Sequence, residues 1–165
     1  MCMEPAAGYE DRETATSAAD RKEIRMWLRL LTCTNLIERE LRARLNREFQ
    51  TTLPRFDVLA QLEREPEGLT MGQLSTRMMV TGGNVTGVID RLAADGLVER
   101  LLAPGDRRSN IVRLTAAGRN LFAKMAAVHH ETLHGLLDGF TRSDVDGLFA
   151  ALGNLKATLR SNIIE

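Results

Sequence analysis

A segment near the middle of the chain carries residue types that could read the edges of nucleic-acid bases. An asparagine amide can hydrogen-bond to adenine, and a threonine methyl group can contact thymine. Glycine lets a backbone approach a phosphate or a groove wall closely, and arginine binds phosphate oxygens. The candidate residues are Thr81, Gly82, Gly83, Asn84, Thr86, Gly87 and Arg91. They can act together only if one element presents them on one face.

The apolar residues of the same segment predict that this element is a helix. They recur at steps of three and four residues, which places them on one helical face. They are Val85, Val88, Ile89 and Leu92. We expect Thr81 to cap this helix and the chain to leave it near Gly96, with the candidate residues facing solvent. Glycines inside a helix cost about 1 kcal/mol each relative to alanine. Their presence in this helix therefore has to be explained, either by close approach of DNA or by tight packing against another helix.

A second group of charged residues lies at the tip of an expected β-hairpin. The runs 97–102 and 110–114 are β-prone, and a Pro-Gly pair between them is typical of a turn. An arginine on a narrow hairpin tip suits the minor groove, where A·T-rich narrowing deepens the negative potential. We expect Arg108 to enter this groove, Asp106 to orient it and Arg107 to add a phosphate contact. The alternative is a solvated turn that contributes little to stability.

Further helices are expected on both sides of this helix-turn-helix and its wing. Pro54 suits the first position of one helix, and Thr70 with Gln73 forms a capping box at the start of the next. Thr115 is expected to cap a long helix that runs to about Gly139. The fold class is therefore mainly α with a small β-wing. The expected organisation is a flexible arm over 1–19, a dimerisation and core helix over 20–48, a winged helix-turn-helix over 54–115 and C-terminal dimerisation helices over 116–165.

The composition limits the functions that this chain can have. It has 165 residues and carries 22 basic and 22 acidic side chains, so it is not a strongly cationic, general nucleic-acid binder. Arginine supplies 19 of the 22 basic residues, which suits bidentate contacts to phosphate and guanine. The acidic start has no apolar run, so we expect no secretory signal, no transmembrane helix and a cytoplasmic location. We find no catalytic constellation, and we expect neither an enzyme nor a cofactor.

The segment from Leu69 to Arg119 resembles the MarR family of bacterial transcriptional regulators. The matching pieces are Asn84-Val85-Thr86, the exit over 96–100, the Asp106-x-Arg108 wing and Leu114-Thr115-x-x-Gly118. The flanking helices also match in length and order, so the resemblance covers about 20–160. It implies a homodimer whose two recognition helices enter successive major grooves of double-stranded DNA, about 34–36 Å apart. The first and last helices would form the dimer interface, and most members are repressors released by small molecules or oxidation.

The resemblance also implies a site for an effector. Family members often bind phenolic or aromatic acids between the first long helix, the helix after Pro54 and the helix after Thr115. The run from Trp27 to Leu36 is similar to regulators of aromatic-acid catabolism, some of which bind CoA thioesters. The residues that would supply apolar walls and a carboxylate partner are Trp27, Leu31, Arg55, Phe56 and His129. The alternative is that these are core and interface residues.

Three other functions stay open. Cys33 could sense oxidants, although we expect a buried structural cysteine inside the first helix. His130 and His134 lie one helical turn apart, which suits zinc, but the set of ligands is incomplete and we expect no metal. The chain could also be a winged-helix module that binds protein partners and has lost DNA binding.

Overall fold

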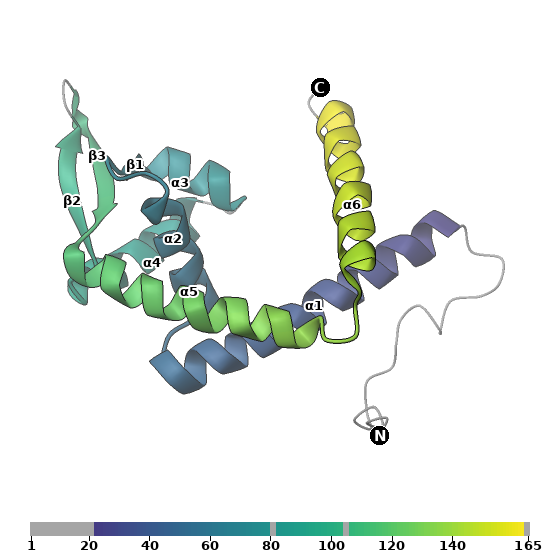
Figure 1. The fold of residues 1–165 in the computed structure, drawn as a ribbon. Coiled ribbons are helices and arrows are strands. Elements are labelled where there is room, and N and C mark those ends of the chain that lie inside the picture. Colours follow the sequence, from purple (N-terminus) through teal and green to yellow (C-terminus); the bar gives the residue numbers. More distant parts are fainter. Residues whose placement is uncertain (1–21, 80–81, 104–105, 164–165) are drawn as a thin grey trace. The chain divides into compact units, whose positions relative to one another are not determined.

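The computed structural model describes residues 22–79, 82–103 and 106–163, with the backbone alone for 103 and 106–109. Figure 1 shows α1 (Lys22–Phe49), α2 (Leu53–Glu63), β1 (Leu69–Thr70), α3 (Met71–Met78), α4 (Gly82–Ala94), β2 (Val98–Ala103), β3 (Asp106–Leu114), α5 (Ala116–Leu136) and α6 (Arg142–Ile163). The chain divides into two compact units, Met1–Thr132 and Leu133–Glu165. The expected fold class, mainly helical with a small β-wing, is confirmed. No helix in the described ranges has the length and apolar character that a membrane span requires.

The three strands form one antiparallel sheet in the order β1-β3-β2. Val98 pairs with Leu114 at the base of the hairpin, and Ala103 pairs with Asp106 beside the turn. Figure 1 shows β2 and β3 as one long hairpin at the edge of its unit. The pairing continues through charged residues, which an antiparallel strand tolerates on a face turned to water. The strand after the turn therefore begins at Asp106, four residues earlier than expected.

Other boundaries differ from the expected ones by short steps. α2 begins at Leu53, so Pro54 is its second residue. α5 ends at Leu136, short of the expected Gly139, which has a φ of 95° in the turn that follows. Strand β1 was not predicted, because two residues are too few to show a period.

The start of the helix-turn-helix follows the expected capping chemistry. The Gln73 backbone N–H donates to Thr70 Oγ1 at 3.3 Å, and the Thr70 backbone N–H donates to Gln73 Oε1 at 2.8 Å. This reciprocal pair satisfies two N–H groups that an uncapped helix would leave without partners. The expected cap of α4, Thr81, lies outside the described residues.

The core of the first unit takes side chains from all of its helices and from β3. Its most deeply buried members are Leu45, Val58, Leu59, Leu62, Leu74, Val85, Ile89, Leu92, Val112, Leu114 and Met125. Each fully buried leucine or isoleucine stabilises the fold by about 1.5–3 kcal/mol relative to an exposed one. Packing of this set therefore fixes α4 against α2 and α3 and fixes the base of the hairpin.

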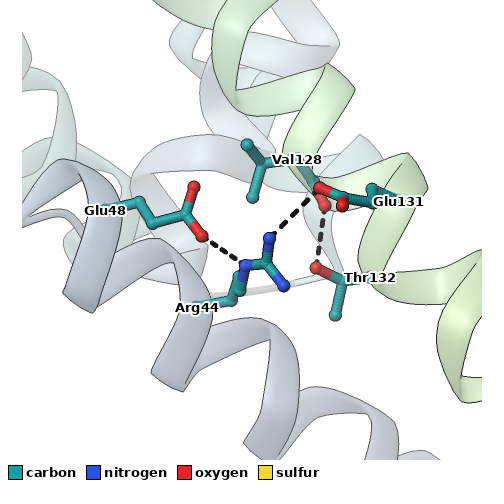
Figure 2. A network of polar contacts seen from close by, with 5 residues as sticks. All are labelled: Arg44, Glu48, Val128, Glu131 and Thr132. Atoms are coloured by element: carbon teal, nitrogen blue, oxygen red, sulfur yellow. Dashed lines mark hydrogen bonds and ion pairs between the residues drawn. The ribbon is translucent and has the colours of Figure 1, made fainter.

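Polar contacts join α1 to α5 at the surface of this core (Figure 2). The Arg44 guanidinium donates to Glu48 on its own helix and to Glu131 Oε2 on α5, the latter at 3.1 Å. The Thr132 hydroxyl bonds back to the Val128 carbonyl at 2.7 Å. Solvent screens accessible ion pairs of this kind, so they orient α1 and α5 more than they stabilise them.

The second unit contains the last helix and none of its described residues on α6 is buried. Thr141 and Asp144 cap α6 reciprocally, with Thr141 N–H to Asp144 Oδ2 at 2.9 Å and Asp144 N–H to Thr141 Oγ1 at 3.2 Å. Its exposed apolar residues are Val145, Leu148, Phe149, Leu152, Leu159 and Ile163. Their spacing places them on one face of α6. Within the second unit, no described segment therefore covers this apolar face of α6.

Candidate nucleic-acid interface

Helix α4 divides into a buried face and an exposed face. Val85, Ile89 and Leu92 are buried, whereas Val88, expected inward, is only partly buried. Val88 borders a hollow of about 290 Å³ that is also lined by Pro54 and Met78, which explains its partial exposure. The exposed residues are Gly82, Gly83, Asn84, Thr86, Gly87 and Arg91. The structure therefore brings six of the seven candidate residues of this segment onto one surface.

The glycines of α4 do not serve packing within the described part of the chain. A Cβ atom built at Gly83 or Gly87 would meet no described atom within 4 Å. At Gly82 it would lie 3.7 Å from Ser75 Oγ, which is an ordinary contact. Tight packing against another helix in the described part of the chain is thus not the reason for these glycines. This favours the other expected reason, which is close approach of DNA.

The polar side chains of this face differ in what they can offer a partner. The Thr86 hydroxyl donates to the Gly82 carbonyl at 3.0 Å within the helix. Contact with a partner would therefore fall mainly to the Thr86 methyl group. Asn84 is exposed in the first turn of the helix, where backbone N–H groups also favour anions.

Four acidic residues before, within and after α4 form ion pairs with arginines. The pairs are Arg77 with Glu65, Arg100 with Asp90, Arg113 with Glu99 and Arg55 with Asp95. Unpaired carboxylates would repel phosphate, and pairing reduces that repulsion. Arg91 has no carboxylate partner within the described ranges. Although the chain is neutral overall, the exposed face of α4 thus carries a positive charge that is available for a phosphate.

The charged residues of the wing lie partly beyond what the structure describes. The backbone of Asp106, Arg107 and Arg108 belongs to β3. Their side chains, like Thr81 as a whole, fall outside the described part of the chain. The expected contacts of Arg108 with the minor groove and of Arg107 with phosphate therefore stay predictions.

Of the expected effector residues, Phe56 and His129 lie together. Their rings stack with centroids 4.6 Å apart, and Phe56 also stacks with Phe122 at 5.6 Å. Burial, and then the neighbouring His130, lower the pKa of His129. A ligand that entered between α2 and α5 here would have to separate these rings. Phe122 was missed in the sequence, although it lies seven residues before His129 on the same helix.

The other expected effector residues do not join this stack of rings. Trp27 is 58% exposed on the N-terminal part of α1, and Leu31 is partly buried. Arg55 pairs with Asp95, which directly follows the end of α4. The Arg55 Nε atom is buried and has no hydrogen-bond partner in the described part of the protein. Arg55 thus connects α2 to the residue that follows α4, and its buried Nε donor has no partner among the described residues.

Cys33 is exposed, so the expectation of a buried structural cysteine was wrong. The N-terminal half of α1 extends beyond the core of its own unit, where Leu41 and Leu45 are the buried residues. Within the described ranges, no three histidine, cysteine, aspartate or glutamate residues are grouped as metal ligands would be.

The carboxyl group of Asp57 on α2 is a weaker acid than an ordinary aspartate. Burial, and then the charge of Glu38, raise its pKa to about 6, while Arg42 lowers it. In the unfolded chain an aspartate titrates near 4. The folded state therefore binds the proton more tightly, and its stability should fall as the pH rises from about 4 to about 6.

We expect Asp57→Asn to remove this part of the pH dependence and to be more stable than the parent at neutral pH. The expected gain is about 1 kcal/mol, because solvent screens the half-buried site. Urea unfolding across this pH range measures it, with the exposed Asp138→Asn as the control. A slope that is unchanged in Asp57→Asn contradicts the assignment.

Sequence comparison places these features in a known class of proteins. A model of the MarR family matches residues 49–109. The transcriptional activatory protein BadR of Rhodopseudomonas palustris is 32% identical over 81% of this chain and 79% of its own length. The regulator PecS of Dickeya dadantii is 30% identical over 70% of each chain.

Solved structures agree with this assignment. A MarR family regulator from Silicibacter pomeroyi has a TM-score of 0.73 and 33% identity, covering 87% of this chain and 99% of that one. The MepR–DNA complex from S. aureus shares the fold with a TM-score of 0.70 and 19% identity, covering 79% of this chain and 94% of that one. The family match and the fold thus define a winged helix-turn-helix transcriptional regulator. The chain belongs to the MarR family; it binds DNA and is not an enzyme.

Proposed function

We propose that the chain is a homodimeric repressor that binds a pseudo-palindromic operator and is released by a small aromatic or phenolic acid or its CoA thioester. The observation that carries the operator-binding part is the exposed face of α4. Its glycines lower helix stability, and a Cβ atom at Gly83 or Gly87 would meet nothing in the described chain, while Asn84, Thr86 and Arg91 beside them suit bases and phosphate. Such a face is explained if a DNA groove approaches the backbone closely.

In this proposal each protomer contacts two grooves. The α4 helices enter successive major grooves about 34–36 Å apart, with Thr81 and the N-terminal glycines nearest the phosphates. The wing reaches the flanking minor groove, where Arg108 inserts, Asp106 orients it and Arg107 contacts the backbone. The test is binding of the purified protein to the DNA upstream of its own gene, with a scrambled duplex of the same composition as the control. Equal, weak affinity for both duplexes contradicts the proposal and favours the alternative, a winged-helix module that binds protein partners.

The apolar face of α6 supports the homodimer. Phe149 is 81% exposed and shares this face with Leu148 and Leu152. Monomeric proteins rarely leave a continuous apolar face in water, and a second copy would cover it. The exposed Trp27 and Ile24 on α1 offer further apolar surface to that copy.

We expect Phe149→Asp to weaken the dimer by at least tenfold in its dissociation constant, because it places a charge in an apolar contact. Analytical ultracentrifugation over a concentration series measures this constant. Asn154→Glu, which adds a charge on the opposite face of the same helix, should leave it unchanged. A parent chain that stays monomeric at all concentrations contradicts the homodimer.

The pair of Arg55 and Asp95 supports a route from effector to DNA. An effector carboxylate near Phe56 and His129 could hydrogen-bond to Arg55 and compete with Asp95 for it. Loss of that pair would release the end of α4 and shift the recognition helix. Thermal shifts with a panel of phenolic acids and their CoA thioesters test this step, with Arg55→Lys as the matched variant. Absence of any shift in the parent contradicts this class of effector.

Two alternatives have their own support. One relative is named as an activatory protein, so a reporter gene under the operator decides between repression and activation. The exposure of Cys33 supports release by oxidation. Release of DNA by peroxide that Cys33→Ser abolishes would favour this sensor over a carboxylate effector.

A further inference from the structure

Met79 ends helix α3 in a backbone conformation that its side chain does not favour. Its φ and ψ are 53° and 36°, in the left-handed region, and its N–H donates to the carbonyls of Ser75 and Thr76. Glycine and asparagine adopt this conformation readily, whereas a residue with a long side chain adopts it at a cost. A methionine at this C-cap therefore lowers the stability of the free protein.

Burial of the Met79 side chain does not offset this cost in the free protein. It is 86% exposed, the highest value among the exposed large apolar residues of the described chain. Among the described residues, the other non-glycine residue with a positive φ is Gln50, after α1, with a φ of 49°. Glutamine is polar and is well solvated by water, so the exposure of the Gln50 side chain does not call for an external contact. Met79 combines an unfavourable backbone with an exposed apolar side chain, and this combination indicates a contact outside the chain.

The position of Met79 indicates which partner makes that contact. It directly follows α3 and precedes Gly82, the first residue of α4, by three positions. A duplex that contacts the N-terminal end of α4 would therefore lie within a few residues of Met79 along the chain. The thioether side chain is unbranched and flexible, so it can adapt to an irregular apolar surface.

We propose that Met79 contacts apolar C–H groups of the bound duplex, either a thymine methyl group in the major groove or a deoxyribose at its edge. This inference rests on the DNA-binding mode proposed above and adds a residue from outside α4 and the wing. The contact explains why a residue that lowers the stability of the free protein occurs at this position. It also predicts that stability and DNA affinity respond to substitution in opposite directions.

The experiment compares four variants on the duplex that the parent protein selects from a randomised library. Met79→Gly and Met79→Asn should raise the melting temperature by a few degrees and weaken binding by about tenfold. Met79→Leu should keep the affinity of the parent. Gln50→Gly, the matched control, should raise the melting temperature without changing the affinity.

A duplex with deoxyuridine in place of thymine distinguishes the two contacts. If Met79→Gly loses affinity only on the thymine duplex, the contact is to a methyl group, and an equal loss on both duplexes assigns it to the sugar. Unchanged affinity of Met79→Gly and Met79→Asn overturns the proposal. So does a loss confined to Met79→Gly, because chain flexibility then explains it. A parent protein that selects no duplex overturns the proposed function itself.

Discussion

Replacing Arg108 with alanine is expected to weaken operator binding by about 1–3 kcal/mol and to reduce the salt dependence of binding by about one phosphate contact. The physical reason is the negative potential of a narrow minor groove, which a guanidinium on the wing would meet directly. The backbone of Arg108 lies on β3, whose pairing with β2 extends to Ala103 and Asp106. Cross-strand pairing of this length can carry a residue near the end of the hairpin away from the helices.

The measurement is a titration of the operator duplex at several salt concentrations. Arg113→Ala is the matched control, because it removes the same charge from the same strand. Arg113 donates to Glu99 Oε1 at 2.6 Å, so its charge is already neutralised and its loss should change affinity far less. Equal effects of the two substitutions would show that only net charge matters and that the wing has no specific role.

Gly118→Ala is expected to destabilise the fold by about 2–4 kcal/mol. A Cβ atom at this position would lie 2.0 Å from the Leu97 carbonyl oxygen and 3.3 Å from Leu114 Cδ2. The first of these atoms is backbone and cannot rotate away. Thr115 also links the start of α5 to Gly96. The Gly118 N–H donates to the Thr115 hydroxyl at 3.0 Å, and that hydroxyl donates to the Gly96 carbonyl at 2.7 Å. The substitution therefore separates α5 from the base of the wing.

Urea or thermal unfolding measures this loss. Gly135→Ala is the matched control, because it lies on the same helix and its Cβ would meet no described atom within 4 Å. Alanine should stabilise the helix there by up to about 1 kcal/mol. Similar stability of Gly118→Ala and the parent would contradict the close approach of α5 to Leu97.

The elements that were predicted well have local causes. The Thr70–Gln73 capping box and the buried stripe of α4 depend on residues three or four positions apart, and that spacing is visible in a sequence. The exposed face of α4 follows from the same stripe. The hairpin was predicted from its β-prone runs, and its extra length depends on cross-strand pairing near Asp106 that composition does not show.

The features that were missed depend on contacts between distant parts of the chain. Arg55 pairs with Asp95, forty positions away, and no periodicity reports such a pair. The exposure of Cys33 depends on how far α1 extends beyond the core. The sequence also left two explanations for the α4 glycines, and only the space around Gly83 and Gly87 favours contact with an external partner.

The most direct test of the α4 interface is the behaviour of Gly87→Ala. The added methyl group has room in the free protein and replaces a poor helix former, so unfolding should show a stability gain of up to about 1 kcal/mol. If the helix backbone approaches a groove wall here, the same methyl group must clash with DNA. Operator affinity, measured beside the melting temperature, should therefore fall by about tenfold. A variant that is more stable and binds the operator as tightly as the parent would contradict the role assigned to this face.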